Sequence, residues 1–307
     1  MQTAYISHPD CLKHDMGSYH PECPQRLVVI ENQLKASGLL SHLQCYDAPL
    51  ATTEQLARVH TPNYIEDIRQ TAPATGLRAL DADTAMNPFT LNAALRAAGA
   101  VVLATDLVLT EKVNNAFCAV RPPGHHAESD RAMGFCLFNN VAVGVTHAIQ
   151  YYHLQRVAIM DFDVHHGNGS EEIFRDNPHV MLCSTFQHPF YPYCGADSSN
   201  PRMINVPLPR GADGTVFRKA VTDTWLPALE RFKPEMIFVS AGFDAHRDDE
   251  MSQLHFSDGD YVWITQQIKA IAGKYANDRI VSVLEGGYEL QMLGRCVAEH
   301  IRGLIAD

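Results

Sequence analysis

The segment Val157-Ala-Ile-Met-Asp161-Phe-Asp163-Val-His165-His-Gly-Asn168-Gly169 starts as an unbroken apolar run and ends in acidic, imidazole and amide side chains. Such a run is typical of a strand that is covered on both faces of a parallel sheet. In extended backbone, residues two apart point the same way, so we expect Asp161, Asp163 and His165 to share one face. Two carboxylates and an imidazole at a buried strand end are costly unless they are paired or bind a metal. The segment therefore predicts a metal site at the C-terminal end of a strand, where open α/β sheets place their sites.

Similar apolar runs recur along the chain and alternate with longer segments of helical pattern, which predicts an α/β fold with a parallel sheet. The expected strands are residues 3–6, 116–120, 157–160, 180–184, 236–240 and 280–284. The expected helices are residues 24–36, 91–109, 140–153, 214–232, 258–275 and 290–305. A length of 307 residues suits one α/β domain, and we expect a single domain over 1–307.

Two segments, 72–88 and 185–213, have no regular pattern and are too long for ordinary connections. We expect them to form loops around a pocket. Disorder or surface decoration is the alternative. The second segment carries a cluster of aromatic residues, which favours the pocket because exposed aromatic side chains need a reason. These residues are Phe186, Phe190, Tyr191 and Tyr193.

The composition excludes several functional classes. The chain has 35 acidic and 24 basic residues, a net charge of −11, which argues against nucleic acid as a partner. The negative charge suits a neutral or cationic substrate, although it also serves solubility alone. Eight scattered cysteines without a CxxC pair indicate a reducing compartment. The N-terminus lacks the features of a signal peptide, and we see no run of about 18 apolar residues, so we expect a cytoplasmic protein with no membrane span.

One further motif follows a strand-like run and completes a metal site. A catalytic zinc takes three protein ligands and leaves one position open. Asp163 and His165 supply two, and Asp244, in Ser240-Ala-Gly-Phe-Asp244, follows another buried run and supplies the third. The alternative is that Asp161 and Asp163 only cap the next helix. A second aspartate at an equivalent strand end favours the metal.

Two histidines and a tyrosine supply acid–base and electrophilic groups. His125 and His126 follow the stiff turn Arg121-Pro-Pro-Gly, and histidine acts as base or acid near neutral pH. One of the pair would hold or tune the other. In Glu285-Gly-Gly-Tyr288 the glycines allow a sharp bend that presents Tyr288, whose phenol would donate a hydrogen bond to an oxyanion. An ordinary tyrosine at the rim of the site is the alternative.

Taken together and in order, these motifs resemble the histone deacetylase superfamily, and most of all the bacterial histone deacetylase-like amidohydrolases of its class II branch. The resemblance runs from His20-Pro-Glu-Cys-Pro-Gln-Arg26 to Glu285-Gly-Gly-Tyr288 and includes RPPGHHA, GFCLFNN, DFDVHHGNG, SAGFDAH and EGGY. It implies the arginase–deacetylase fold, a parallel sheet of about eight strands between helices with long loops at the C-terminal strand ends. It also implies zinc-dependent, hydroxamate-sensitive removal of an acetyl group from an acetylated amine, with acetyl-lysine as the first expectation.

The resemblance assigns roles by position. The implied ligands of one catalytic Zn²⁺ are Asp163, His165 and Asp244. His126 is implied to be the general base and acid, with Asn168 as its partner. His125 is implied to be its charged neighbour, with Asp161 as its partner, and Tyr288 is the phenol implied to polarise the carbonyl. The residues implied to line the substrate are Gly134, Phe135, Tyr191, Met251 and Gly287. The implied ligands of a structural K⁺ beside the zinc, through side chains and carbonyls, are Asp161, Asp163, His165 and Ser184.

Some positions depart from parts of the family. Asn168 stands where class I relatives have aspartate, a class II trait that should leave His126 less basic. Tyr191 brings a hydroxyl to a wall where many relatives have phenylalanine. Met251 differs from the acidic gatekeeper of one polyamine-selective branch, and the neighbouring Glu250 is expected to point elsewhere.

Alternative functions remain open. A two-manganese arginase-like hydrolase would need DxHxD and DxD motifs, whereas His165 is followed by His166 and Gly167. A binding module for acetyl-lysine with little activity is a second alternative, although such relatives often lose the tyrosine that is present here as Tyr288. Small acetylated amines, acetylpolyamines and longer acyl groups remain alternative substrates. The sequence does not predict the oligomeric state.

Overall fold

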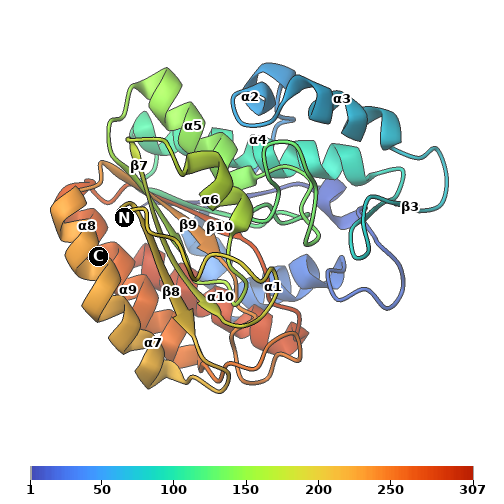
Figure 1. Ribbon diagram of the computed structural model, residues 1–307. Coiled ribbons are helices and arrows are strands. Elements are labelled where there is room, and N and C mark those ends of the chain that lie inside the picture. Colours follow the sequence, from blue (N-terminus) through green and yellow to red (C-terminus); the bar gives the residue numbers. More distant parts are fainter. Residues whose placement is uncertain (1, 307) are drawn as a thin grey trace.

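The computed structural model describes residues 2–306, in which eight parallel strands form one sheet with the order β2-β1-β5-β10-β9-β6-β7-β8 (Figure 1). The strands are β1 (Thr3–Ser7), β2 (Leu43–Asp47), β5 (Asn115–Cys118), β6 (Val157–Asp161), β7 (Val180–Gln187), β8 (Met203–Leu208), β9 (Met236–Ala241) and β10 (Ile280–Leu284). This is the expected arginase–deacetylase architecture, and the parallel sheet of about eight strands is confirmed.

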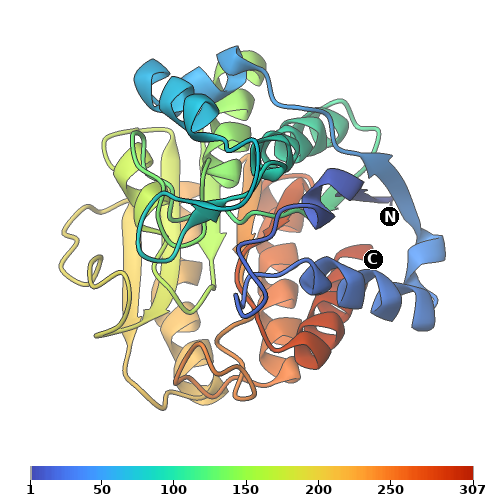
Figure 2. The ribbon, with the colours of Figure 1, turned by 90° about the vertical axis from the view of Figure 1, so that its right-hand side faces the viewer.

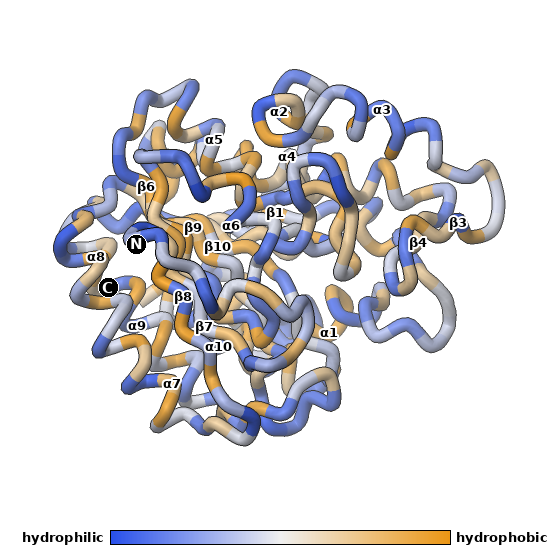
Figure 3. The backbone as a smooth tube through the Cα atoms, in the orientation of Figure 1, coloured by the Kyte–Doolittle hydropathy of each residue, from blue (hydrophilic) through white to orange (hydrophobic). Residues whose placement is uncertain are grey.

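Helices cover both faces of the sheet. One layer consists of α1 (Gln25–Ala36), α7 (Gly214–Ala220), α8 (Leu226–Phe232), α9 (Asp258–Tyr275) and α10 (Leu290–Ile305). The other consists of α2 (Thr53–Ala57), α3 (Pro62–Thr71), α4 (Thr90–Leu109), α5 (Asn140–Tyr152) and α6 (Asn168–Phe174). Figure 2 shows the sheet between the two layers. Because both faces are covered, strands β5, β6, β7, β9 and β10 are buried along their whole length, and the apolar residues concentrate there (Figure 3).

The edge strands differ from the sequence expectation. Segment 185–213 was expected to be irregular, and this is wrong in part: β7 continues to Gln187, and Met203–Leu208 forms β8. β8 lacks the unbroken apolar run that identified the other strands, because it is a half-exposed edge strand. It also contains Pro207, a residue tolerated at sheet edges. β2 was also missed, being short and largely uncovered.

Three other segments refine the expectation. The helix expected at 214–232 is interrupted by a π-helical turn, η3 (Val221–Trp225), just before Pro227, which has no N–H for a helical bond. The strand expected at 116–120 ends at Cys118. Segment 72–88 holds only the short antiparallel pair β3 (Arg78–Ala79) and β4 (Ala85–Met86).

Helix α4 is the one helix in residues 2–306 that is long and apolar enough to cross a membrane by length and composition. Within its most apolar window, 67% of the residues are buried inside the protein. The helix packs against α5 and against strands β1, β5 and β10, which is the position of a core helix. All eight cysteines are free.

Candidate metal centre and active site

The four sequence motifs follow β5, β10, β9 and β6, which are neighbours at the centre of the sheet. Parallel strands place their C-terminal ends at the same edge, so the segments that follow them meet there. The expected convergence of the motifs from distant parts of the sequence therefore follows from the strand order.

Asp163, His165 and Asp244 lie together, with one ligand atom from each within 4.8 Å of the others. His165 Nδ1 is 3.2 Å from Asp163 Oδ1 and 3.3 Å from Asp244 Oδ2. All three side chains are buried. The space between them exists because residue 286 is a glycine: a Cβ on Gly286 would lie 2.0 Å from Asp244 Oδ2.

These three residues fit a divalent cation. Burial and repulsion by the neighbouring Asp163 carboxylate raise the pKa of Asp244 to about 6. A cation bound between the two carboxylates would offset this repulsion. Asp244 Oδ2 is buried and has no hydrogen-bond partner in residues 2–306, which leaves an oxygen lone pair that a cation would satisfy. Burial would lower the pKa of His165, but Asp163 and Asp244 outweigh it and raise the pKa to about 9. Two carboxylates and one imidazole are a donor set that zinc accepts.

The backbone between Asp161 and His165 differs from the expectation. β6 ends at Asp161, and the chain then bends instead of remaining extended. Asp161 Oδ1 accepts the N–H of Asp163 at 3.1 Å, and Asp163 Oδ1 accepts the N–H of His165 at 2.9 Å. The argument from strand alternation was therefore wrong about the backbone, and these local carboxylate–backbone bonds shape the segment instead.

His125 and His126 are buried side by side, with ring centroids 4.0 Å apart, and carry opposite pKa shifts. Burial would lower the pKa of His125, but Asp161, whose Oδ2 is 2.9 Å from Nδ1, outweighs it and raises the pKa to about 10. His126 Nδ1 is instead 2.8 Å from the neutral Asn168 Oδ1. Burial and the charge on His125 hold the pKa of His126 well below its ordinary value. The pair thus combines a charged imidazolium with a neutral imidazole, which can accept a proton.

The turn that carries Tyr288 is fixed from both sides. Arg26 Nε donates to the Gly287 carbonyl at 2.7 Å, and its guanidinium carbon lies 4.9 Å from the centre of the Tyr288 ring. The backbone N–H groups of Tyr288 and Glu289 donate to Asp249 Oδ2 at 2.6 and 3.1 Å. Burial raises the pKa of the Tyr288 phenol well above its ordinary value, and the carboxylates of Asp244 and Asp163 add to the rise. The phenol therefore stays protonated and can donate a hydrogen bond.

Three of the residues expected to line the substrate lie beside His126 and Tyr288. Gly134 has φ +56°, and a Cβ there would be 2.5 Å from the His126 ring and 3.0 Å from the Tyr191 hydroxyl. The Tyr191 ring is 5.2 Å from the His126 ring. The Phe135 ring is 5.9 Å from that of Tyr288. These aromatic side chains form one wall of the site. Because Gly134 has no side chain, the backbone there lies close to the His126 ring and the Tyr191 hydroxyl.

The remaining expected positions lie next to the site. Met251 shares the Asp249 carboxylate with Tyr288, because its N–H donates to Asp249 Oδ1 at 2.9 Å. Gly287 supplies the carbonyl that Arg26 binds. Whether either residue touches a substrate stays a prediction.

The residues expected to bind potassium are also brought together. Asp161 on β6 pairs in register with Ser184 on β7, and Asp163 and His165 follow directly along the chain. Ser184 Oγ is 3.1 Å from His166 Nδ1. Carboxylate, hydroxyl and carbonyl oxygens suit a hard cation, and K⁺ at this position stays a prediction.

Sequence reasoning missed the residues that hold this machinery in place. Glu285 Oε2 accepts the N–H groups of Gly124 and His125 at 2.7 and 3.1 Å, which fixes the histidine turn. At the tyrosine turn, Asp249 accepts a backbone N–H group and Arg26 donates to a backbone carbonyl. Glu285 and Arg26 stood inside quoted motifs, and for Glu285 a charged residue next to two glycines was the available signal.

Comparison with known proteins places the chain among deacetylases. The family model "Histone deacetylase domain" matches residues 20–304. The "Type-2 histone deacetylase 2" of Dictyostelium discoideum is 34% identical, over 100% of this chain and 21% of that protein. The "Histone deacetylase-like amidohydrolase" of Pseudomonas aeruginosa is 36% identical, over 93% of this chain and 77% of that protein. The "Polyamine deacetylase HDAC10" of Mus musculus is 37% identical, over 100% of this chain and 49% of that protein. The chain thus spans less than half of two of these relatives.

A solved structure, the HDA15 HD domain, superposes with a TM-score of 0.92 at 32% identity, and the match covers 99% of this chain and 88% of that one.

Proposed function

The chain belongs to the histone deacetylase family, and from that premise we propose that it is a zinc-dependent amidohydrolase that removes an acetyl group from an acetylated amine. Acetyl-lysine is the first candidate substrate. The observation that carries the proposal is the proximity of a buried Asp–His–Asp ligand set to a pair of histidines, one charged and one neutral. A metal to activate water and a neutral base beside it are the two requirements of amide hydrolysis.

In the proposed mechanism, Asp163, His165 and Asp244 would hold the zinc ion. When bound, zinc would lower the pKa of water and polarise the acetamide carbonyl. His126 accepts a proton from the water as the water oxygen attacks the carbonyl carbon. The Tyr288 phenol donates a hydrogen bond to the oxyanion that forms. His126 then gives its proton to the amide nitrogen, the C–N bond breaks, and acetate and a free amine leave.

The charged His125 supports this sequence by electrostatics. Its imidazolium, paired with Asp161, discourages a second positive charge on His126 at rest, which keeps the base free. The same positive charge stabilises the oxyanion.

Turnover of a fluorogenic acetyl-lysine peptide, measured before and after chelation and after zinc is restored, tests the proposal. We expect activity that disappears with the chelator and returns with the metal. Peptide binding without turnover would support the acetyl-lysine-binding alternative and reject the hydrolase.

Acetylpolyamines are the second candidate substrate. The net charge of −11 favours cationic molecules, and a relative of 37% identity is named a polyamine deacetylase. Met251 argues against an acetylpolyamine substrate, because the methionine side chain lacks the negative charge that would select a cationic molecule. The ratio of kcat/KM for acetylspermidine and an acetyl-lysine peptide decides between the two, and Met251→Glu is expected to shift that ratio toward the polyamine.

A further inference from the structure

The amide of Asn168 has a second partner that the mechanism above does not use. Its Oδ1 is 2.8 Å from His126 Nδ1, while its Nδ2 donates to Glu128 Oε1 at 2.8 Å. Nδ2 also lies 3.3 Å from Met133 Sδ and 3.4 Å from the His126 carbonyl, which are weaker contacts. Asn168 is buried, so its bonding depends on these protein groups.

The carboxylate of Glu128 determines the orientation of the Asn168 side-chain amide. The two ends of an asparagine amide are similar in size but opposite in hydrogen bonding, since the oxygen accepts and the NH₂ donates. The carboxylate of Glu128 only accepts, so the NH₂ end must face it. The oxygen of Asn168 must then face His126 Nδ1, which has to carry the proton. His126 Nε2 is left with its lone pair free.

We propose that Glu128 is a positioning residue that sets the reactive tautomer of His126 by orienting Asn168, an inference that rests on the proposed function. Without an acceptor-only partner, the amide of Asn168 could rotate by 180°. Its NH₂ would then face Nδ1, and the proton of His126 would move to Nε2. A base whose Nε2 carries a proton cannot accept one from water.

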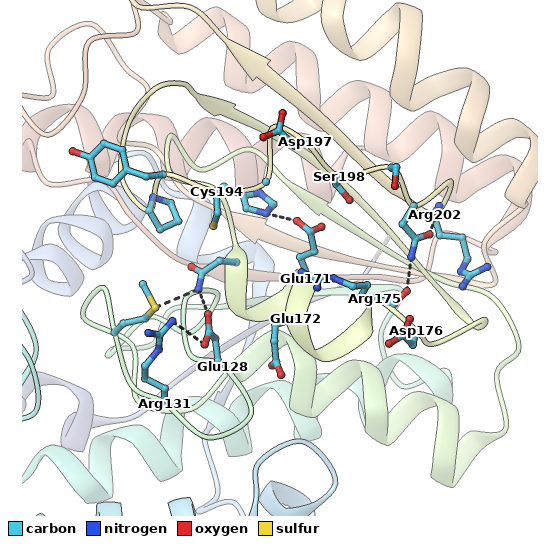
Figure 4. A pocket seen from close by; sticks show the side chains of 18 of the residues that line it. Glu128, Arg131, Glu171, Glu172, Arg175, Asp176, Cys194, Asp197, Ser198 and Arg202 are labelled. Carbon is cyan, nitrogen blue, oxygen red and sulfur yellow. Dashed lines mark hydrogen bonds and ion pairs between the residues drawn. The ribbon is translucent and has the colours of Figure 1, made fainter.

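Glu128 has further contacts through its side chain and its backbone. Its carboxylate pairs with Arg131 at 2.9 Å, and Figure 4 shows both on one wall of a cavity of about 990 Å³. Its backbone N–H donates to the Arg131 carbonyl at 2.9 Å. Its carbonyl is 2.9 Å from His60 Nδ1. The two backbone contacts fix the position of the residue, and the carboxylate itself is shared between Arg131 and Asn168.

The first test replaces Glu128 by glutamine, which can donate as well as accept. In Glu128→Gln we expect kcat on the acetylated substrate to fall on the order of 10-fold with KM unchanged. This is part of the roughly 100- to 10,000-fold that acid–base catalysis contributes. Glu172→Gln is the matched control, because Glu172 lines the same cavity and binds Ser129, not Asn168. It should leave kcat within about two-fold.

The second test separates orientation from a merely structural role. Asn168→Asp places a carboxylate beside His126 that accepts the Nδ1 proton in either orientation and needs no orienting partner. Glu128 then only repels that carboxylate, whereas a glutamine in its place would donate to it. We therefore expect Glu128→Gln to lower kcat in the otherwise wild-type protein and to raise it, or leave it unchanged, when combined with Asn168→Asp. An equal loss in both backgrounds would overturn the proposal.

The third test reads the tautomer directly and does not depend on turnover. In protein labelled with ¹⁵N-histidine, ring-nitrogen shifts of His126, assigned with His126→Asn, should show the Nδ1–H form in the wild type. Glu128→Gln should show the Nε2–H form appearing. An unchanged Nδ1–H form would refute the role of Glu128. Absence of hydrolysis by the wild type would refute the proposed function alone, because the tautomer is still measured.

Discussion

Replacing Asp249 by asparagine perturbs the turn that presents Tyr288 without touching the metal ligands. The buried Asp249 carboxylate accepts three backbone N–H groups, at 2.6 Å from Tyr288, 3.1 Å from Glu289 and 2.9 Å from Met251. Asparagine keeps one accepting oxygen and gains an NH₂ that only donates. If the oxygen stays with Tyr288 and Glu289, the NH₂ faces the N–H of Met251, and one bond becomes a repulsion.

The magnitude follows from these bonds. Losing one hydrogen bond to a charged group costs about 1.5–3 kcal/mol. The two bonds that remain lose their charge assistance, which roughly halves their strength. We expect Asp249→Asn to lower the free energy of unfolding by about 2–4 kcal/mol and, because Tyr288 loses its fixed position, to lower kcat at least about 10-fold.

Urea unfolding, kcat on an acetyl-lysine peptide and zinc content by elemental analysis measure the three consequences. Zinc content should not change. Asp248→Asn is the control, since the Asp248 side chain is 52% exposed and pairs with His246 and Arg295. If Asp249→Asn behaves like this control in both unfolding and turnover, the carboxylate does not hold the turn and the reasoning is refuted.

Three further outcomes are expected. Tyr288→Phe should lower kcat on the order of 100-fold with normal zinc content; near-normal turnover would remove the phenol from the mechanism. Asp244→Asn should lower zinc occupancy, measured by elemental analysis, and full occupancy would exclude Asp244 as a ligand. Burial lowers the pKa of His60 to about 4, and its two ring nitrogens are already engaged with the Glu128 carbonyl and the Asn139 N–H. Below about pH 6.5, His60 is therefore protonated in the unfolded chain but stays neutral in the folded protein. The free energy of unfolding falls as the pH is lowered toward 4, by up to about 1.4 kcal/mol per pH unit. His60→Gln should flatten that part of the curve in urea titrations, and an unchanged slope would contradict the assignment.

The residues that meet at the candidate site could be predicted because each lies in a motif where polar residues follow an apolar run. His126, Asp163 and Asp244 stand next to buried strands, and a buried polar group without a partner is costly. The physical constraint is local, so the sequence shows it. The central strands were predictable for the same reason, since they are buried on both faces.

The supporting groups could not be found in this way. Arg26 binds a carbonyl 261 residues away, and Glu128 reaches Asn168 across 40 residues. Nothing in the local pattern around Glu128 distinguishes it from a solvated surface acid, because only the fold sets its partner. The edge strand β8 was missed because its half-exposed residues and Pro207 resemble a loop.

The strand order also bears on how the protein is synthesised. β10 comes after the other strands in the sequence, yet it lies between β5 and β9 at the centre of the sheet. A ribosome therefore exposes two unpaired inner edges for as long as residues 280–284 remain in the exit tunnel. During that interval the growing chain is open to chaperones and to self-association, and it lacks Tyr288, the phenol of the proposed mechanism. Closure of the sheet and completion of the candidate site therefore depend on the same segment, residues 280–288.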